Sequence, residues 1–212
     1  MQAAAQAILA AAPTSEAGMN ERRFNAAHAH RLDDPERRAW LPPAEVLGAL
    51  ALHVGDTIAD VGAGTGYFSL PLAQAVGPQG KVYAVDAQEE MLSLLRQKLD
   101  EFTLSIVELI HAEADNTGLP ASCCDLVFAA NVWHEFDDHA AVLRESARVL
   151  KADGRIAILD WRTDVLPEHG PPLEHRLNWF YAVDALRSSG FQKVATSNVG
   201  LYSWLVLGER KR

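Results

Sequence analysis

The chain has 212 residues, of which 49% are hydrophobic and 22% are charged, and its formal net charge is −9. This length predicts one domain of roughly 100–200 residues with an extension, and the ordinary composition excludes collagen, coiled coils and disordered chains. The acidic balance argues against a general binder of nucleic acid or of anionic membranes, and the adjacent pair Cys123 and Cys124 excludes a disulfide framework.

The N-terminal residues differ in pattern from the rest of the chain. Residues 1–20 are rich in alanine and lack a basic leader and an amphipathic stripe, which predicts a flexible tail rather than a secretory signal. Residues 21–43 are expected to be helical and mix arginines with acidic residues. Two interpretations remain open for them: a solvated surface helix, or a lid over the site that follows in sequence. Because no apolar run reaches the roughly 18 residues of a spanning helix, we expect a cytoplasmic protein.

From residue 44 to residue 212, short apolar runs alternate with segments of helical period. The apolar runs predict strands at residues 57–61, 81–85, 105–110, 126–130 and 155–159. Helices are expected at residues 44–52, 67–76, 88–101, 137–150 and 173–189. This alternation predicts one α/β domain with a parallel sheet covered on both faces. Residues 191–197 and 201–207 are separated by a short turn, so they are expected to pair as an antiparallel hairpin.

Three glycines follow the first predicted strand, at positions 62, 64 and 66. Glycines between a strand and a helix let the backbone approach a ligand closely, and the amides at the helix start face that ligand. The spacing departs from the G-x-G-x-x-G of dinucleotide sites, which favours a ligand without a pyrophosphate and argues against a dinucleotide oxidoreductase. Asp86 ends the next strand, 20 residues after Gly66, where an acid that binds ribose is expected. Each feature alone is also found in ordinary turns and caps, but the combination indicates a nucleoside site.

These motifs resemble those of the class I S-adenosylmethionine-dependent methyltransferases over about residues 30–208. The matching segments are residues 60–66, 82–86, 111–115 with 119–120, 125–131 and 150–155. Leu-Asp-Asp-Pro at 32–35 and Gly-Pro-Pro at 170–172 are similar to a group of small bacterial and archaeal members without a settled substrate. The resemblance implies a doubly wound, Rossmann-like seven-stranded sheet of order 3-2-1-4-5-7-6 with only strand 7 antiparallel. It also implies S-adenosylmethionine as cofactor and S-adenosylhomocysteine as product.

The resemblance assigns cofactor contacts to the ends of the first four strands. Asp86 is expected to meet the ribose hydroxyls, and Asp115 the adenine amino group. Asn116 stands where relatives usually carry alanine, which affects the backbone contact to adenine. The full cofactor set is Asp60, Gly62, Ala63, Gly64, Gly66, Asp86, Ala87, Asp115, Asn116 and Asn131.

The end of the fourth strand faces the transferred methyl group in this family. His134 and Glu135 follow that strand and are the catalytic candidates, and His134 is favoured as a base because its ordinary pKa lies near neutrality. The alternative is that His134 only packs beside Asp137. Residues expected to wall the substrate pocket are Trp133, Trp161 and Arg162.

Other chemistry has little support in the sequence. The pair His28 and His30 has no companion ligand at metal spacing, so no metal is expected, and no Gly-x-Ser-x-Gly turn indicates a hydrolase. We expect a small-molecule acceptor, with neither nucleic acid nor a membrane as partner, and a homodimer remains an open oligomeric state. A second hypothesis is a catalytically degenerate module that binds the cofactor and acts through a protein partner.

Overall fold

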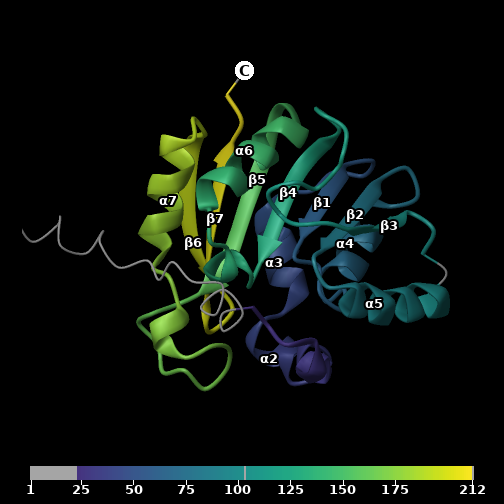
Figure 1. Ribbon diagram of the computed structural model, residues 1–212, viewed down its shortest axis with the longest axis horizontal. Helices are drawn as coiled ribbons and strands as arrows, with labels where there is room; N and C mark the ends of the chain where they lie inside the picture. Colours follow the sequence, from purple (N-terminus) through teal and green to yellow (C-terminus); the bar gives the residue numbers. More distant parts are fainter. Residues whose placement is uncertain (1–22, 103, 212) are drawn as a thin grey trace, which may run out of the picture.

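The computed structural model describes residues 23–102 and 104–211, so the flexible tail predicted for residues 1–20 lies outside the described residues. Within these residues, seven strands form one sheet of order β3-β2-β1-β4-β5-β7-β6. β7 runs antiparallel to both of its neighbours, and the other pairs are parallel. The predicted seven-stranded, doubly wound fold is therefore confirmed (Figure 1). The strands are β1 (Thr57–Val61), β2 (Lys81–Asp86), β3 (Val107–His111), β4 (Cys124–Ala130), β5 (Leu150–Trp161), β6 (Gln192–Val199) and β7 (Ser203–Glu209).

Helices cover both faces of the sheet. One apolar cluster joins two helices to alternate strand residues such as Val127 and Ile158. A second cluster joins two other helices to the intervening strand residues, such as Ile58 and Phe128. Because neighbouring residues of a strand point to opposite faces, both faces are buried. The first cluster contains α6 (His139–Val149) and α7 (Trp179–Ser188), and the second contains α3 (Pro43–Leu50) and α4 (Ser69–Val76); α5 (Glu89–Phe102) packs beside α4.

Two predicted helices differ from the observed ones. The segment at residues 21–43 is not one helix, because η1 (Ala26–Asp33) is a 3₁₀ helix separated by Pro35 from the short α2 (Arg37–Trp40). A proline disfavours helical geometry in the residue before it, which accounts for the break. The helix expected at residues 173–189 begins late, since η3 (Leu173–His175) is followed by Asn178, whose side chain caps α7.

The carboxyl ends of β1, β2 and β4 meet at one edge of the sheet. β1 lies between the other two, with Val61 opposite Val85 on β2 and Ala129 on β4. The connections from β1 and β4 therefore lead to opposite sides, which is the switch point where open α/β sheets bind ligands. α2 lies beyond this edge of the sheet (Figure 1).

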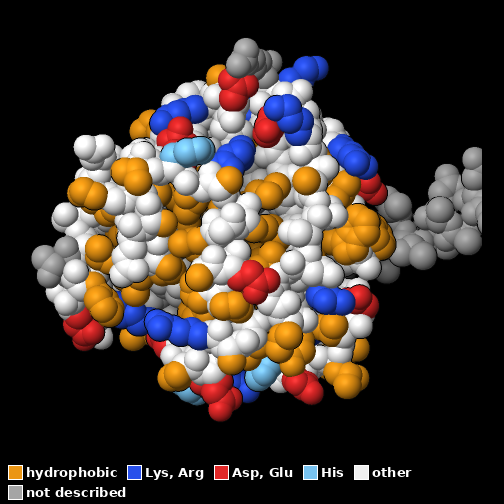
Figure 2. All heavy atoms as spheres, turned by 180° about the vertical axis from the view of Figure 1, so that it is seen from behind, with side chains coloured by type: hydrophobic (Ala, Val, Ile, Leu, Met, Phe, Trp, Pro, Cys, Tyr) orange, Lys and Arg blue, Asp and Glu red, His pale blue; other side chains and the backbone are white. Residues whose placement is uncertain are grey.

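The face seen from behind relative to Figure 1 carries both acidic and basic side chains. Basic and acidic side chains lie next to one another near its upper and lower ends, with hydrophobic side chains between them (Figure 2). Such mixing gives this face no large field of one sign. In the part of the chain that the structure describes, no helix is long and apolar enough to cross a membrane.

Candidate functional site

A cavity opens at the edge where β1, β2 and β4 end. It holds about 940 Å³ of atom-free space, counted to its open mouth. Concave sites that combine apolar side chains with a few polar groups are where small molecules and cofactors bind, and this cavity has both kinds of lining. Its lining comes from residues 60–65, 67, 68, 85–88, 112–114, 130–132, 135 and 136, and from residues 23, 24, 32 and 37 of the N-terminal segment.

The glycine loop needs glycine at its first and third positions. Gly62 and Gly66 have φ angles of 74° and 85°, in the left-handed region that side chains rarely adopt. A Cβ atom at Gly62 would lie 2.8 Å from the methyl carbons of Val132, so the loop also packs too tightly there for any side chain. Gly62, Ala63 and Gly64 line the cavity, whereas Gly66 packs against Leu95 of α5 outside the lining.

Two carboxyl groups flank this loop. Asp60 is buried at the end of β1 and accepts a hydrogen bond of 2.6 Å from Ser69 Oγ. Burial raises the pKa of Asp60 to about 7. Asp86 accepts hydrogen bonds from Gly64 N–H at 2.7 Å and Gln88 N–H at 2.9 Å, and burial raises its pKa as well. These bonds fix the Asp86 carboxyl group beside the loop, and its contact with a ribose stays a prediction.

Asn131 contributes a side chain with unpartnered polar atoms to the cavity wall. Its φ of 55° lies in the left-handed region, and its N–H donates to Leu159 O at 2.7 Å. Both polar atoms of its side chain are buried without a hydrogen-bond partner among the described residues, although Asn131 lines the cavity. A buried amide without partners costs about 1–3 kcal/mol, so a polar ligand in the cavity would stabilise this side chain.

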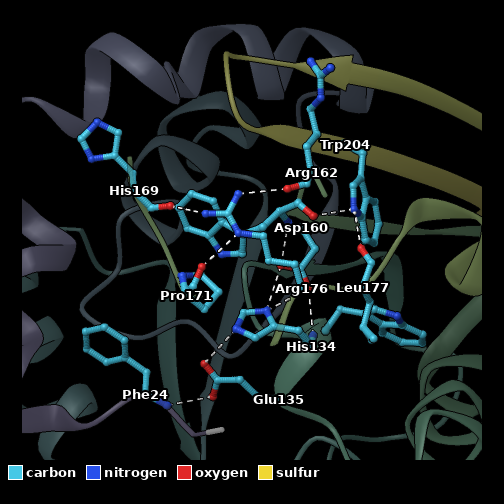
Figure 3. Close-up of polar contacts among 12 residues, drawn as sticks. Phe24, His134, Glu135, Asp160, Arg162, His169, Pro171, Arg176, Leu177 and Trp204 are labelled. Atoms are coloured by element: carbon cyan, nitrogen blue, oxygen red, sulfur yellow. Dashed lines mark hydrogen bonds and ion pairs between the residues drawn. The ribbon is translucent and has the colours of Figure 1, made fainter. Parts of the chain in front are cut away.

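His134 and Glu135 have different surroundings. His134 is buried outside the cavity lining, where Asp160 at the end of β5 accepts hydrogen bonds from its backbone N–H (2.8 Å) and its Nδ1 (2.9 Å). Its partner is therefore Asp160, and not the Asp137 of the alternative interpretation. Glu135 lines the cavity, and its Oε1 lies 3.9 Å from His134 Nε2. Figure 3 shows the imidazole between the two carboxyl groups.

The protonation of this trio follows from burial and charge. Nδ1 of His134 pairs with Asp160 at 2.9 Å, so Nε2 is the ring nitrogen that faces Glu135. Burial lowers the pKa of His134, but the charge and hydrogen bond of Asp160 outweigh burial and raise it. Burial raises the pKa of Glu135 to about 7, against the opposing effects of His134 and of the Phe24 N–H. Glu135 can therefore gain or lose a proton near neutral pH.

The N-terminal segment lies over the cavity. Arg23 forms an ion pair of 3.0 Å with Glu113, and Phe24 N–H donates to Glu135 Oε2 at 3.2 Å. Farther along, Asp33 accepts a hydrogen bond of 2.8 Å from Thr65 Oγ1 of the glycine loop. These contacts place residues 23–37 against the ligand site, and their movement as a lid stays a prediction.

Two residues assigned to adenine recognition lie outside the cavity lining. Asp115 and Asn116 are exposed at a tight turn, where Asn116 N–H donates to Glu113 O at 3.1 Å. The turn places Ala112, Glu113 and Ala114 along the cavity instead. Sequence position alone did not distinguish the apex of this turn from its base.

The substrate-pocket prediction also differs from the structure. The described cavity lining contains none of Trp133, Trp161 and Arg162. Trp133 is buried against the ring of His139, with 4.2 Å between ring centroids. Trp161 packs against Trp40, with 5.5 Å between their ring centroids. The guanidinium of Arg162 pairs with Asp164 at 2.9 Å, on the loop after β5. All three side chains thus stabilise neighbouring segments in this structure.

Several lining residues were not among the site residues that the sequence analysis named, although most of them lie in or beside its motifs, because a motif does not show which of its neighbours face the cavity. For the N-terminal segment the sequence signal was the Leu-Asp-Asp-Pro run, which begins with Leu32 and closely precedes Arg37. The missed residues include Phe24, Leu32, Arg37, Tyr67, Gln88, Glu113, Val132 and Phe136.

Known proteins match this chain at the levels of sequence and structure. A family model described as a methyltransferase domain matches residues 59–158. The solved structure of an S-adenosylmethionine-dependent methyltransferase from Aquifex aeolicus is similar, with 33% identity and a TM-score of 0.84 over 89% of this chain and 100% of that chain. The chain is 34% identical over 123 residues to a demethylmenaquinone methyltransferase of Listeria welshimeri, and 37% identical over 116 residues to one of a Geobacillus strain. These alignments cover 58% and 55% of this chain and 52% and 50% of the relatives, so the chain spans about half the length of the curated relatives that it matches.

Proposed function

The chain belongs to the class I S-adenosylmethionine-dependent methyltransferases, and from this premise we propose that it methylates a small aromatic acceptor whose proton is removed by Glu135. The observation that carries the proposal is the Glu135 carboxyl group, which lines the cavity and has a pKa raised to about 7. A carboxyl group with this pKa is matched to proton transfer near neutral pH.

The cavity fits the cofactor that the family uses. S-adenosylmethionine supplies an electrophilic methyl group when it is bound. Asp86 would hold the ribose hydroxyls of the cofactor through charge-assisted hydrogen bonds. The backbone of the glycine loop would pass close to the cofactor. The unpartnered amide of Asn131 supports this fit, because it lacks a polar partner on the wall of the same cavity.

His134 and Asp160 would position Glu135 rather than touch the acceptor. Asp160 is 1% exposed and holds His134 through both its backbone N–H and its ring, so the imidazole has one orientation. His134 Nε2 then faces Glu135 and favours its carboxylate, while Phe24 N–H holds the other carboxylate oxygen. A base held at two atoms is aligned before the acceptor arrives, which lowers the cost of reaching the reactive geometry.

The acceptor class is inferred from the lining and from the relatives. Phe24, Phe68 and Phe136 line the cavity together with Leu32 and Val132, a set of apolar side chains suited to a flat ring. Relatives that are 34% and 37% identical to this chain over about half of their own length are named demethylmenaquinone methyltransferases, which favours a quinone-type ring. This chain aligns with only about half the length of these relatives, so the quinone-type acceptor is proposed for it and not transferred from them.

Transfer of radiolabelled methyl tests this function. The purified chain is incubated with labelled S-adenosylmethionine and either reduced naphthoquinones or fractionated cell extract, and the extract is separated into small molecules, protein and RNA. We expect label in the small-molecule fraction, with a Glu135→Gln variant strongly reduced and Glu90→Gln on the exposed surface of α5 unchanged. Label in protein or RNA would contradict the acceptor class. Cofactor binding without transfer in any fraction would favour the degenerate module instead.

A further inference from the structure

Arg37 is a buried cation in the cavity lining that the mechanism above does not use. It is 6% exposed on α2, and its Nη1 donates to Leu32 O at 2.9 Å. Its guanidinium carbon lies 4.0 Å from the centre of the Tyr67 ring. Nε has no hydrogen-bond partner among the described residues, and no carboxylate of those residues forms an ion pair with Arg37. Burial lowers its pKa to about 10, so the group is still charged at neutral pH.

The charges around the cavity make this arginine unusual. Asp60, Asp86, Glu113 and Glu135 all line the cavity, and the lining arginine other than Arg37, Arg23, is paired with Glu113. Burial lowers the pKa of Arg37 more than Tyr67 and Asp33 raise it, and a buried guanidinium without an ion pair is costly. The missing anion is therefore expected to be supplied by the ligand.

Hydrogen bonds between the N-terminal segment and the glycine loop fix the position of Arg37. The η1–α2 segment packs alongside the glycine loop. Thr65 Oγ1 donates a hydrogen bond to Asp33, and Tyr67 Oη donates to Leu41 O at 2.6 Å. Arg37 therefore lies beside the helical end of the glycine loop, whereas Asp86 comes from β2 on its strand side. A ligand whose ribose meets Asp86 can place a second polar group near Tyr67.

We infer that Arg37 binds the carboxylate of the cofactor's amino-acid portion. A guanidinium offers several N–H donors in a planar fork, which matches the two oxygens of a carboxylate. The cationic parts of the same ligand then lie among the cavity carboxyl groups. This assignment rests on the cofactor, and it holds whichever acceptor is methylated.

Calorimetry with two cofactor analogues tests the assignment without turnover. S-adenosylhomocysteine carries the carboxylate, and its decarboxylated form retains the nucleoside, the sulfur and the amine. Wild type should prefer the first by roughly 10- to 150-fold, the range of hydrogen bonds to charged groups. Arg37→Met should lose this preference by weakening only S-adenosylhomocysteine, and Arg37→Lys should retain part of it. Arg38→Met, a neighbouring arginine outside the lining, is the matched control and should keep the full preference.

Each other outcome overturns the inference. Equal weakening of both analogues in Arg37→Met would show that Arg37 only stabilises the N-terminal segment. Unchanged binding of S-adenosylhomocysteine would assign Arg37 to an anionic group of the acceptor or to no ligand. If wild type bound neither analogue, the cofactor assignment would fail together with this one, which distinguishes that failure from a failure at Arg37 alone.

Discussion

Replacing Glu135 with glutamine tests the proposed base most directly. Glutamine keeps the size of the side chain and an oxygen that can accept from Phe24 N–H, but it cannot take a proton. Loss of a positioned base lowers turnover by about 10²–10⁴, while affinity for S-adenosylhomocysteine should change little because Asp86, Arg37 and the glycine loop are intact.

The pH dependence follows from the raised pKa of Glu135. With a pKa of about 7, the carboxylate fraction falls about tenfold for each pH unit below 7, and the single-turnover rate of wild type should fall with it. The Glu135→Gln variant should lose this limb. The assay is a single-turnover transfer rate measured with saturating cofactor from about pH 5.5 to 9, beside calorimetry of S-adenosylhomocysteine.

The pH dependence of the free energy of unfolding gives an independent measurement of the raised pKa of Glu135. A carboxyl group whose pKa is raised in the folded state favours folding while it is protonated. Its contribution is complete below pH 4.5 and is lost as the pH rises to about 7. The size of this loss is about 3 kcal/mol, since each pKa unit corresponds to about 1.4 kcal/mol. Glu135→Gln should therefore gain stability relative to wild type between these pH values, as measured by urea unfolding.

Two results would refute the reasoning. A variant that keeps the wild-type rate would show that the acceptor needs no base or finds one elsewhere. A Glu135→Gln variant whose rate is low but still falls below about pH 7 would show that another group, such as His134, titrates there. Glu135 would then be a binding residue.

Three further predictions use the same preparation. Asp86→Ala should weaken S-adenosylhomocysteine by roughly 10- to 150-fold in calorimetry, because a charge-assisted pair to ribose is lost, and unchanged affinity would contradict the assignment. His134→Ala should destabilise the fold by about 3–5 kcal/mol in urea unfolding, since it removes the ring that pairs with buried Asp160 and leaves this carboxyl group only backbone N–H donors; unchanged stability would show that the ring pair is not needed for folding. Hydrogen exchange at residues 23–40 should slow when S-adenosylhomocysteine binds if this segment acts as a lid, and equal protection with and without ligand would exclude it.

The sequence alone determined the parts of this protein that depend on local pattern. Apolar runs of strand length alternate with amphipathic segments, and this pattern predicted strands and helices near their observed places because burial on a sheet imposes a distinct period on each. Asp60 and Asp86 could be predicted as site residues because both end parallel strands, whose carboxyl ends meet at one edge. The order of the sheet came from the family resemblance, since strand pairing is not encoded by local period.

Only the tertiary structure decided which side chains line the cavity. Asp160 contacts His134 across 26 residues of sequence, because β5 lies beside β4, and no local pattern links the two. His134 and Glu135 are neighbours in one short 3₁₀ turn, yet only Glu135 lines the cavity, since successive side chains of such a turn point in different directions. Arg37 reaches the site because the N-terminal segment packs along the glycine loop. That contact depends on long-range packing, which the spacing of residues along the chain does not record.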